Sequence, residues 1–341
     1  MDFSTLQQLT QLPGVSGRES AVRRFISQQV APYADDVKTD ALGNLIVLKK
    51  GTSDKNLLLA AHMDEVGMIV IGALDNGLIA YGQRGIDSRV VVSKRVLVGD
   101  EMIEGVIGAK AIHLQTAADR KTVLGHSELF VDIGAKDKDD ALKYVKPGDR
   151  IGFATKFKRL GEKRVMGKAL DDRVGCAILM QLLANDYECD FYGVFTVQEE
   201  VGLRGMYAAA YSVAPDVVIV LEGTTANDMP EVKNVGFVTK MSHGPAISFM
   251  DNATIVSPDM FKALTETANA SGIKWQPRQG TTGANDQGPA QRMRAGCKTG
   301  CISVPCRYIH SPASIADIDD IMGAYALADA FLKNKKFNEV L

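Results

Sequence analysis

Short, mostly apolar runs alternate with amphipathic stretches in the first and last parts of the chain. The apolar runs, each of the length of a buried strand, are 57–61, 191–197, 216–221 and 299–304. The amphipathic stretches, in which apolar residues recur at helical spacing, are 172–183, 203–211, 258–270 and 314–333. Because alternating strands and helices form a sheet that is covered on both faces, the pattern predicts an α/β fold with a mixed central sheet.

The N-terminal segment fits the same sheet. Residues 22–30 carry a helical apolar stripe, and Ser16 with Glu19 matches the capping-box pattern that starts a helix. Two strand-like runs, 36–39 and 44–48, follow this helix.

Between residues 68 and 163 the pattern changes to short strands that are separated by Gly and Asp turns. The expected strands include 68–71, 78–81, 95–98, 104–107 and 129–133. One helix, 138–144, is expected here, and it ends before a Pro-Gly-Asp turn at 147–149. We therefore predict one α/β domain made of residues 1–67 plus 164–341, with a small β-rich domain, 68–163, inserted into it.

Residues of the types that bind metal ions stand at the ends of the predicted strands and at one helix start. They are His62, Asp64, Asp171, Asp172, Glu199, Glu200, Glu222 and His310. In an open α/β sheet, ligands bind beyond the carboxyl ends of the strands, so distant segments bring such residues together. Histidines and carboxylates suit zinc or cobalt. The set exceeds what one tetrahedral ion needs and fits two ions that share one bridging carboxylate.

Chemical roles follow from the spacing of some of these residues. Asp64 lies two residues after His62, so its carboxylate can accept the second ring N–H of a ligating histidine and fix its orientation. We therefore expect Asp64 to orient His62 rather than to bind an ion. Of the pair Glu199 and Glu200, one can ligate while its neighbour stays free to act as a general base.

Each feature also has an ordinary structural interpretation when it is taken singly. The 199–200 pair is also consistent with a solvated strand end, and the 171–172 pair with a helix N-cap in a favourable dipole. Glu222 alone fits a salt-bridged strand end, and His310 alone fits a surface histidine. The metal hypothesis rests on all of them falling at the ends of elements of one sheet.

Composition narrows the class of protein. The chain has 341 residues and a net charge of −2, which gives no support for nucleic-acid or membrane-surface partners. No apolar run is long enough to cross a bilayer, and the N-terminus lacks a signal-peptide pattern. Five sparse cysteines favour reduced thiols and a cytoplasmic protein. Three of them cluster at 297–306, but their spacing is not that of a usual zinc knuckle.

Four motifs carry a resemblance that covers nearly the whole chain. They are AHMDEVG at 61–67, GKALDDRVG at 167–175, QEEVG at 198–202 and PCRYIHS at 305–311. In this order they resemble the co-catalytic metallo-aminopeptidases of the glutamyl-aminopeptidase and tetrahedral (TET) aminopeptidase family, some members of which have been labelled endoglucanases. The resemblance implies a metal-dependent aminopeptidase that removes N-terminal residues from short peptides with two divalent ions, zinc or cobalt, or else manganese.

The resemblance also implies a role for each matching residue. His62 and Glu222 would ligate one ion, Glu200 and His310 the other, Asp171 would bridge both, Asp64 would orient His62, and Glu199 would be the general base. It further implies that the insertion is a PDZ-like dimerisation domain, and that dimers build a tetrahedral shell of twelve subunits that encloses the active sites.

Two departures and two alternatives remain open at this stage. The family usually has Asp where this chain has Glu222, and it has Gly-Thr-Asp-Ala near the substrate pocket where this chain reads GANDQ at 283–287. The alternative functions are a di-metal deacylase of N-acyl amino acids and a catalytically impaired shell protein. A glycosidase is disfavoured, because adjacent glutamates rarely flank a sugar on both sides. A preference for an acidic N-terminal residue would need a basic side chain in the substrate pocket. The sequence does not show which basic residue this would be; the candidates are Lys240, Arg278, Arg292 and Arg294.

Overall fold

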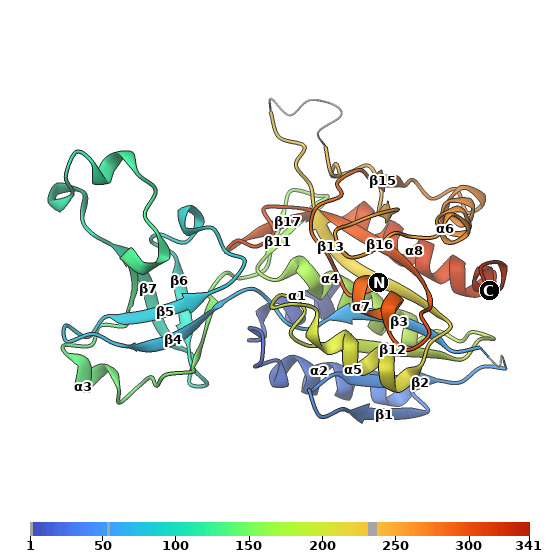
Figure 1. Ribbon diagram of the computed structural model, residues 1–341, viewed down its shortest axis with the longest axis horizontal. Helices are drawn as coiled ribbons and strands as arrows, with labels where there is room; N and C mark the ends of the chain where they lie inside the picture. Colours follow the sequence, from blue (N-terminus) through green and yellow to red (C-terminus); the bar gives the residue numbers. More distant parts are fainter. Residues whose placement is uncertain (1–2, 53–54, 231–236) are drawn as a thin grey trace.

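The computed structural model describes residues 3–52, 55–230 and 237–341. It consists of two units that lie side by side (Figure 1). The larger unit is a sheet with helices, and the smaller one is a β-barrel formed by the middle of the chain.

Four parallel strands form the centre of the large sheet. In spatial order they are β12 (Phe191–Thr196), β3 (Leu57–His62), β13 (Val217–Thr225) and β16 (Lys298–Arg307). Antiparallel strands extend it on both sides: β2 (Leu45–Lys49) and β1 (Asp36–Thr39) beyond β12, and β17 (Ser314–Asp317), β11 (Arg164–Gly167) and β10 (Lys158–Leu160) beyond β16. Two short strands, β14 (Ala246–Ser248) and β15 (Gln276–Arg278), pair beside β16. The mixed central sheet predicted from the sequence is confirmed.

Successive side chains of β3 point to opposite faces of the sheet and enter two separate cores. Leu57, Leu59 and Ala61 pack in the larger core with helices α1 (Phe3–Gln11), α2 (Ser20–Val30), α4 (Leu170–Leu183), α6 (Pro258–Ala270) and α8 (Ile318–Lys333). Leu58 and Ala60 pack on the other face with α5 (Arg204–Val213) and α7 (Gln287–Arg292). Because both faces of the sheet are buried, its central strands are apolar over most of their length, which is why they could be recognised in the sequence.

The smaller unit is a closed barrel of six strands with its own apolar core. Its strands, in the order in which they pair, are β4 (Met68–Ala73), β5 (Ile79–Gln83), β8 (Leu129–Asp132), β7 (Ile103–Ala109), β6 (Arg95–Val98) and β9 (Arg150–Phe153). The expected helix is the short α3 (Lys138–Ala141). The closed barrel does not confirm the PDZ-like label. The strand β10, which lies within the predicted insertion 68–163, pairs with β11 in the large sheet.

Two predicted helix starts are wrong. Helix α2 begins at Ser20, and its N-cap residue Glu19 makes no side-chain capping hydrogen bond, so the capping box of Ser16 and Glu19 does not form. The final helix begins at Ile318, because residues Ser314–Asp317 form the antiparallel strand β17. Short 3₁₀ turns at Ala31–Tyr33, Ser88–Val90, Ile112–Leu114, Asp119–Lys121, His126–Glu128 and Lys336–Glu339 complete the regular structure of the described residues.

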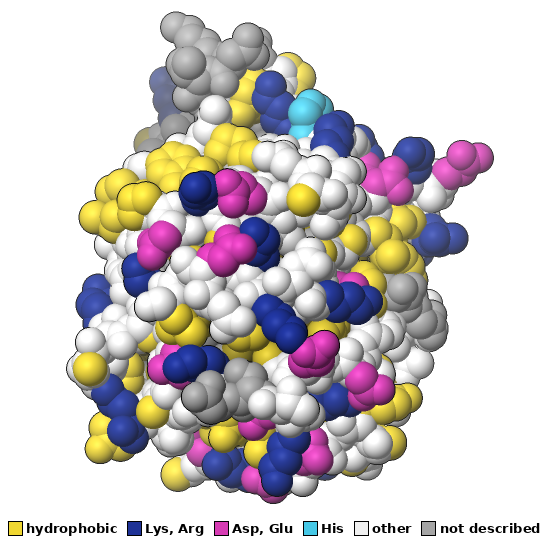
Figure 2. Space-filling model, turned by 90° about the vertical axis from the view of Figure 1, so that its right-hand side faces the viewer, with side chains coloured by type: hydrophobic (Ala, Val, Ile, Leu, Met, Phe, Trp, Pro, Cys, Tyr) yellow, Lys and Arg dark blue, Asp and Glu magenta, His cyan; other side chains and the backbone are white. Residues whose placement is uncertain are grey.

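The surface carries charges of both signs. On the face shown in Figure 2, which is the end of the α/β unit away from the barrel, basic and acidic side chains are interspersed with apolar ones. None of the helices in the described ranges is long and apolar enough to span a bilayer.

Candidate metal centre

The carboxyl ends of the four parallel strands bring the predicted residues to one edge of the sheet. His62 is the last residue of β3 and lies beside Thr196, the last residue of β12. Glu199 and Glu200 follow β12 after a short turn, and His310 follows β16. Glu222 lies inside β13, where it is buried, rather than at the end of that strand.

The two aspartates that start α4 have different roles. Asp172 accepts hydrogen bonds from the backbone N–H of Gly175, three residues on, at 2.9 Å and from the backbone N–H of His62 at 3.1 Å. Asp172 therefore does what an N-cap residue does and also anchors the end of β3. Asp171 instead turns its carboxylate toward the histidines, so the N-cap interpretation applies to Asp172 and not to Asp171.

The carboxylate of Asp171 stands between two half-sites. On one side, the Nε2 atom of His62 lies 3.4 Å from Asp171 Oδ1 and 3.3 Å from Glu222 Oε1. On the other side, the Nε2 atom of His310 lies 3.6 Å from Asp171 Oδ2 and 3.1 Å from Glu200 Oε2. Each half-site thus contains one histidine, one terminal carboxylate and one oxygen of the shared aspartate.

Asp64 contacts the backbone of Glu199 and Glu200 and the ring of His62. Its Oδ1 accepts the backbone N–H of Glu199 at 2.9 Å, and its Oδ2 accepts the backbone N–H of Glu200 at 3.2 Å. The Nδ1 atom of His62 lies 3.1 Å from the backbone carbonyl of Asp64 and 3.5 Å from its Oδ1. The second ring nitrogen of His62 therefore faces Asp64, which leaves Nε2 to face the half-site.

The cluster contains more buried carboxyl groups than histidines that could balance their charge. Burial raises the pKa of Glu222, and the nearby Asp171 carboxylate adds to the rise against the opposing effect of His62, so that its pKa is about 8. Burial lowers the pKa of His310, but the contacts with Asp171 and Glu200 outweigh it and raise that pKa to about 11. Buried carboxylates in this number require cations as partners.

The donors present fit divalent ions. Asp171 Oδ1 and Glu200 Oε1 are buried and have no hydrogen-bond partner among the described residues, as expected of atoms that ligate. Ligand atoms of His62, Asp171 and Glu200 lie within 4.8 Å of one another. Two imidazoles with carboxylates form a set that suits zinc or a related transition ion. Asp172 lies in a second such group with His62 and Glu222, but its oxygens already accept backbone N–H groups.

Glu199 differs from its neighbour Glu200. Its carboxylate makes no hydrogen bond to any described residue, and it lines the cavity that contains both half-sites. Burial raises the pKa of Glu199 well above its ordinary value, and the carboxylates of Glu222, Glu200 and Asp286 add to this rise while His62 opposes it. A carboxyl group with a raised pKa beside a ligand cavity is suited to proton transfer.

The cavity in front of the cluster has a volume of about 410 Å³. Of the four cations that the sequence could not rank, Arg278 lines it. Its guanidinium bonds to Thr224 Oγ1 at 3.1 Å, to the carbonyl of Thr282 at 2.7 Å and to the carbonyl of Gly280 at 2.5 Å. Arg278 therefore fixes the loop 280–283 at the mouth of the cavity.

The sequence did not identify two supporting residues of this site. Asp286, within the unusual 283–287 segment, is buried and accepts the hydroxyl of Thr196 at 2.6 Å, so that it supports the end of β12. Ser16 donates a hydrogen bond from its hydroxyl to Asp64 at 2.6 Å, whereas the local sequence pattern assigned this serine to a helix capping box. Neither bond has a signal in local sequence, because each partner lies far away along the chain.

Comparison with known proteins matches most of the chain to peptidases, by sequence and by structure. Residues 43–327 match the family described as M42 glutamyl aminopeptidase. A putative aminopeptidase from Acetivibrio thermocellus is 37% identical over 95% of this chain and 96% of its own length. A TET aminopeptidase structure from a marine-sediment Thaumarchaeota archaeon superposes with a TM-score of 0.96 at 33% identity, covering 99% of this chain and 97% of that one. TET1 peptidase from Pyrococcus horikoshii, whose structure is described as assembling into a tetrahedron or a large octahedral shell, gives a TM-score of 0.88 at 33% identity, covering 97% and 99%.

Proposed function

The chain belongs to the M42 glutamyl aminopeptidase family and is a peptidase, and we propose that it removes N-terminal residues from short peptides with two divalent ions per chain. The observation that carries this proposal is the position of Asp171, with one oxygen toward His62 and Glu222 and the other toward His310 and Glu200. A single shared carboxylate between two similar half-sites is the arrangement of two-metal hydrolases.

In this proposal each residue of the cluster has a defined task. His62, Glu222 and Asp171 would hold one ion, and Asp171, Glu200 and His310 would hold the other. When bound, these ions would supply Lewis acidity to polarise the scissile carbonyl and to acidify a water molecule. Glu199 accepts the proton of the attacking water and passes it to the nitrogen of the leaving amine. Asp64 keeps His62 oriented and fixes the backbone of both glutamates.

The ions would be zinc or cobalt, because the two imidazoles favour these over calcium or magnesium, and manganese is a third candidate because the other ligands are carboxylates. All five cysteines are free thiols, which supports a reducing compartment, and we place the protein in the cytoplasm.

The experiment that tests the proposed function is a substrate panel with controlled metal content. Aminoacyl-anilides and N-acetyl amino acids are assayed after chelation and stepwise addition of zinc, cobalt or manganese. We expect metal-dependent release from the free-amine substrates alone. Hydrolysis of the acetylated substrates alone would instead establish a deacylase, and a protein that neither binds metal nor cleaves any substrate would be an impaired homologue.

Glu222 is expected to be a ligand although it is one methylene longer than the usual aspartate. Glu222→Asp should keep two metal equivalents, while Glu222→Ala should lose one of them, because His62 and Asp171 alone leave that half-site without its terminal carboxylate. Metal analysis of the three proteins after identical dialysis checks this. Two full equivalents in the Ala variant would remove Glu222 from the site.

We further propose that the barrel mediates assembly into dimers and a tetrahedral dodecamer, as the resemblance implies. Ile112 and Leu114 on the barrel are 70% and 61% exposed in the single chain. Large exposed apolar side chains next to one another mark interaction surfaces. The structurally similar TET1 peptidase from Pyrococcus horikoshii supports this proposal, since it is described as assembling into a tetrahedron or a large octahedral shell.

The double substitution Ile112→Ser with Leu114→Ser should therefore give smaller particles in light scattering. The matched control is Ile255→Ser, which changes a side chain that is 70% exposed on the α/β unit and should leave the particle size unchanged. An unchanged large particle in the double variant would place the assembly contacts elsewhere.

A further inference from the structure

One short segment, residues 14–18, lies between the barrel and the cluster and touches both. On its inner side, Val15 forms a parallel bridge with Glu65, and the backbone N–H of Glu65 donates to the carbonyl of Gly14 at 3.0 Å. The backbone N–H of Gly14 in turn donates to Glu65 Oε1 at 3.1 Å. The segment is thus tied to the residue that directly follows Asp64.

Ser16 makes the contact that reaches the site itself. Its hydroxyl donates to Asp64 Oδ2 at 2.6 Å, the same oxygen that accepts the backbone N–H of Glu200. No other side-chain hydroxyl or amide in the described ranges bonds to Asp64. Ser16 is therefore one of the groups that hold the Asp64 carboxylate, together with the backbone N–H groups of Glu199 and Glu200.

On its outer side the same segment is held by the barrel. Arg150, the first residue of β9, donates from Nε to the carbonyl of Ser16 at 2.9 Å and from Nη1 to the carbonyl of Gly148 at 2.6 Å. Its guanidinium lies over Gly17, where a Cβ atom would come within 2.8 Å of Nη2. Gly17 also has a φ of +80°, a backbone conformation that favours glycine at this position. Arg18 pairs with Asp100 of the barrel nearby.

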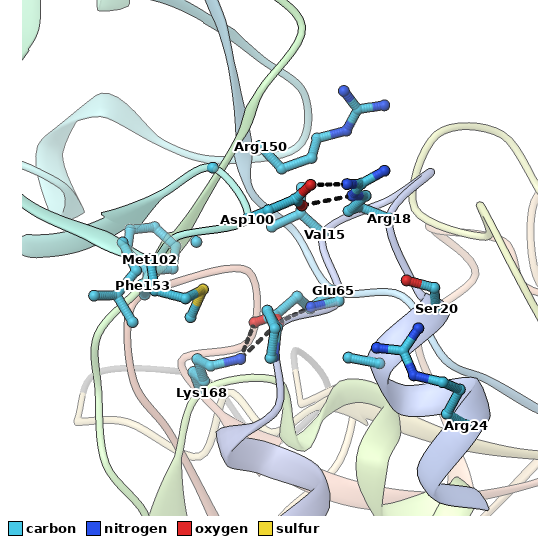
Figure 3. A pocket seen from close by; sticks show the side chains of 16 residues that line it. Val15, Arg18, Ser20, Arg24, Glu65, Asp100, Met102, Arg150, Phe153 and Lys168 are labelled. Atoms are coloured by element: carbon cyan, nitrogen blue, oxygen red, sulfur yellow. Dashed lines mark hydrogen bonds and ion pairs between the residues drawn. The ribbon is translucent and has the colours of Figure 1, made fainter. Parts of the chain in front are cut away.

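The space behind the segment is not filled. A cavity of about 290 Å³ lies between residues 13–24, the barrel and the buried pair Glu65–Lys168. Figure 3 shows the Arg18–Asp100 pair on one side of this cavity and the Glu65–Lys168 pair on the other. Gly14, Val15 and Arg18 of the segment line this cavity and Ser16 does not, so the contact of Ser16 with the barrel is its bond to Arg150.

We propose that Ser16 is a positioning residue for the metal centre and that the barrel controls it through Arg150. This inference rests on the proposed function. Arg150 of the barrel fixes the position of the Ser16 carbonyl, and the Ser16 hydroxyl in turn fixes the position of the Asp64 carboxylate. Asp64 then fixes the orientation of the His62 ring and the backbone positions of Glu199 and Glu200.

Ser16→Ala tests the inner step. It should lower kcat and the affinity of the chelated protein for cobalt by up to about 10-fold, the low end of the about 10–100-fold that is typical when the direct partner of a ligand is removed, because Ser16 acts one contact further out, through Asp64; KM should change little. Ser16→Thr keeps the hydroxyl and should restore most of both. Ser20→Ala, the same change on the next helix, removes no bond to Asp64 and should leave kcat and cobalt affinity unchanged.

A double-mutant cycle tests the outer step. Arg150→Ala should lower kcat and cobalt affinity in the same direction, and Ser16→Ala with Arg150→Ala should be no worse than Ser16→Ala alone, because both act through one contact. Arg24→Ala, a change of another arginine that lines the same cavity, is the matched control. Thermal unfolding of each variant separates a positioning effect from loss of the fold.

Three results would overturn the inference: a Ser16→Ala enzyme equal to wild type, a Ser16→Thr enzyme as impaired as Ser16→Ala, or fully additive effects in the cycle. A wild-type protein without metal-dependent peptidase activity would contradict the proposed function instead. The cobalt affinities would still report on Ser16 in that case, so the two failures are distinguishable.

Discussion

Glu199→Gln is expected to lower kcat by about 10²–10⁴-fold while the protein keeps two metal equivalents. The amide has nearly the shape of the carboxylate but accepts no proton from water at neutral pH. Glu199 is suited to the role of base because its carboxylate faces the cavity, bonds to no described residue, and has a pKa that burial raises. Steady-state kinetics on an aminoacyl-anilide together with metal analysis check this result.

The neighbouring residue provides the control. Glu200→Gln should lose metal, since Glu200 Oε2 lies 3.1 Å from His310 Nε2 in one half-site. If Glu199→Gln loses metal and Glu200→Gln keeps it, the roles of the two glutamates are the reverse of those proposed.

Asp171→Ala is expected to remove both ions and all measurable activity. Both oxygens of Asp171 face histidines of different half-sites, so its loss leaves each half-site with only two ligands. Because removing the mere partner of a ligand costs about 10–100-fold in affinity, removing the shared ligand should cost more than about 100-fold at both sites. Calorimetric titration with zinc measures this directly.

Glu222→Ala is the comparison for Asp171→Ala, because it should release one ion and not two. If Asp171→Ala also released only one ion, Asp171 would be a terminal ligand and the bridge would have to be another group. Circular dichroism of both variants checks that the helix α4, whose first turn contains Asp171, is still formed.

The sequence was sufficient to predict the centre of the sheet. Residues 57–61 are apolar without interruption because β3 is buried on both faces. A short run of this kind is typical of a buried strand, so the sequence predicts the strand directly. The positions of His62 and the 199–200 pair follow from it, since strand ends in a parallel sheet share one edge.

Other parts of the site could not be predicted, because partners distant in the chain determine them. Ser16 and Glu19 have the spacing of a capping box, but Ser16 bonds to Asp64, and Glu19 accepts the backbone N–H groups of Gly17 and Gln198. The bonds of Ser16 to Asp64 and of Gln198 to Glu19 are tertiary contacts, and they outweigh a local preference that is worth about 1 kcal/mol. Residues 314–317 likewise become a strand because β11 offers them a pairing edge.

The position of Glu222 shows a different limit. The sequence placed it at the end of a strand, but β13 continues to Thr225 in register with β16. A glutamate inside a buried strand contradicts the usual pattern of apolar residues, and it is stable there only beside cationic partners. The sequence signals that such a residue is unusual, while only the folded sheet shows that it faces His62.

The measurement that tests the central claim most directly is the metal content of the wild-type protein, Glu199→Gln and Asp171→Ala after identical dialysis, by inductively coupled plasma mass spectrometry. Two ions shared through Asp171, with Glu199 as a base that binds neither, predict two equivalents, two equivalents and none. One equivalent in the wild-type protein, or two in Asp171→Ala, would contradict a bridged two-ion centre.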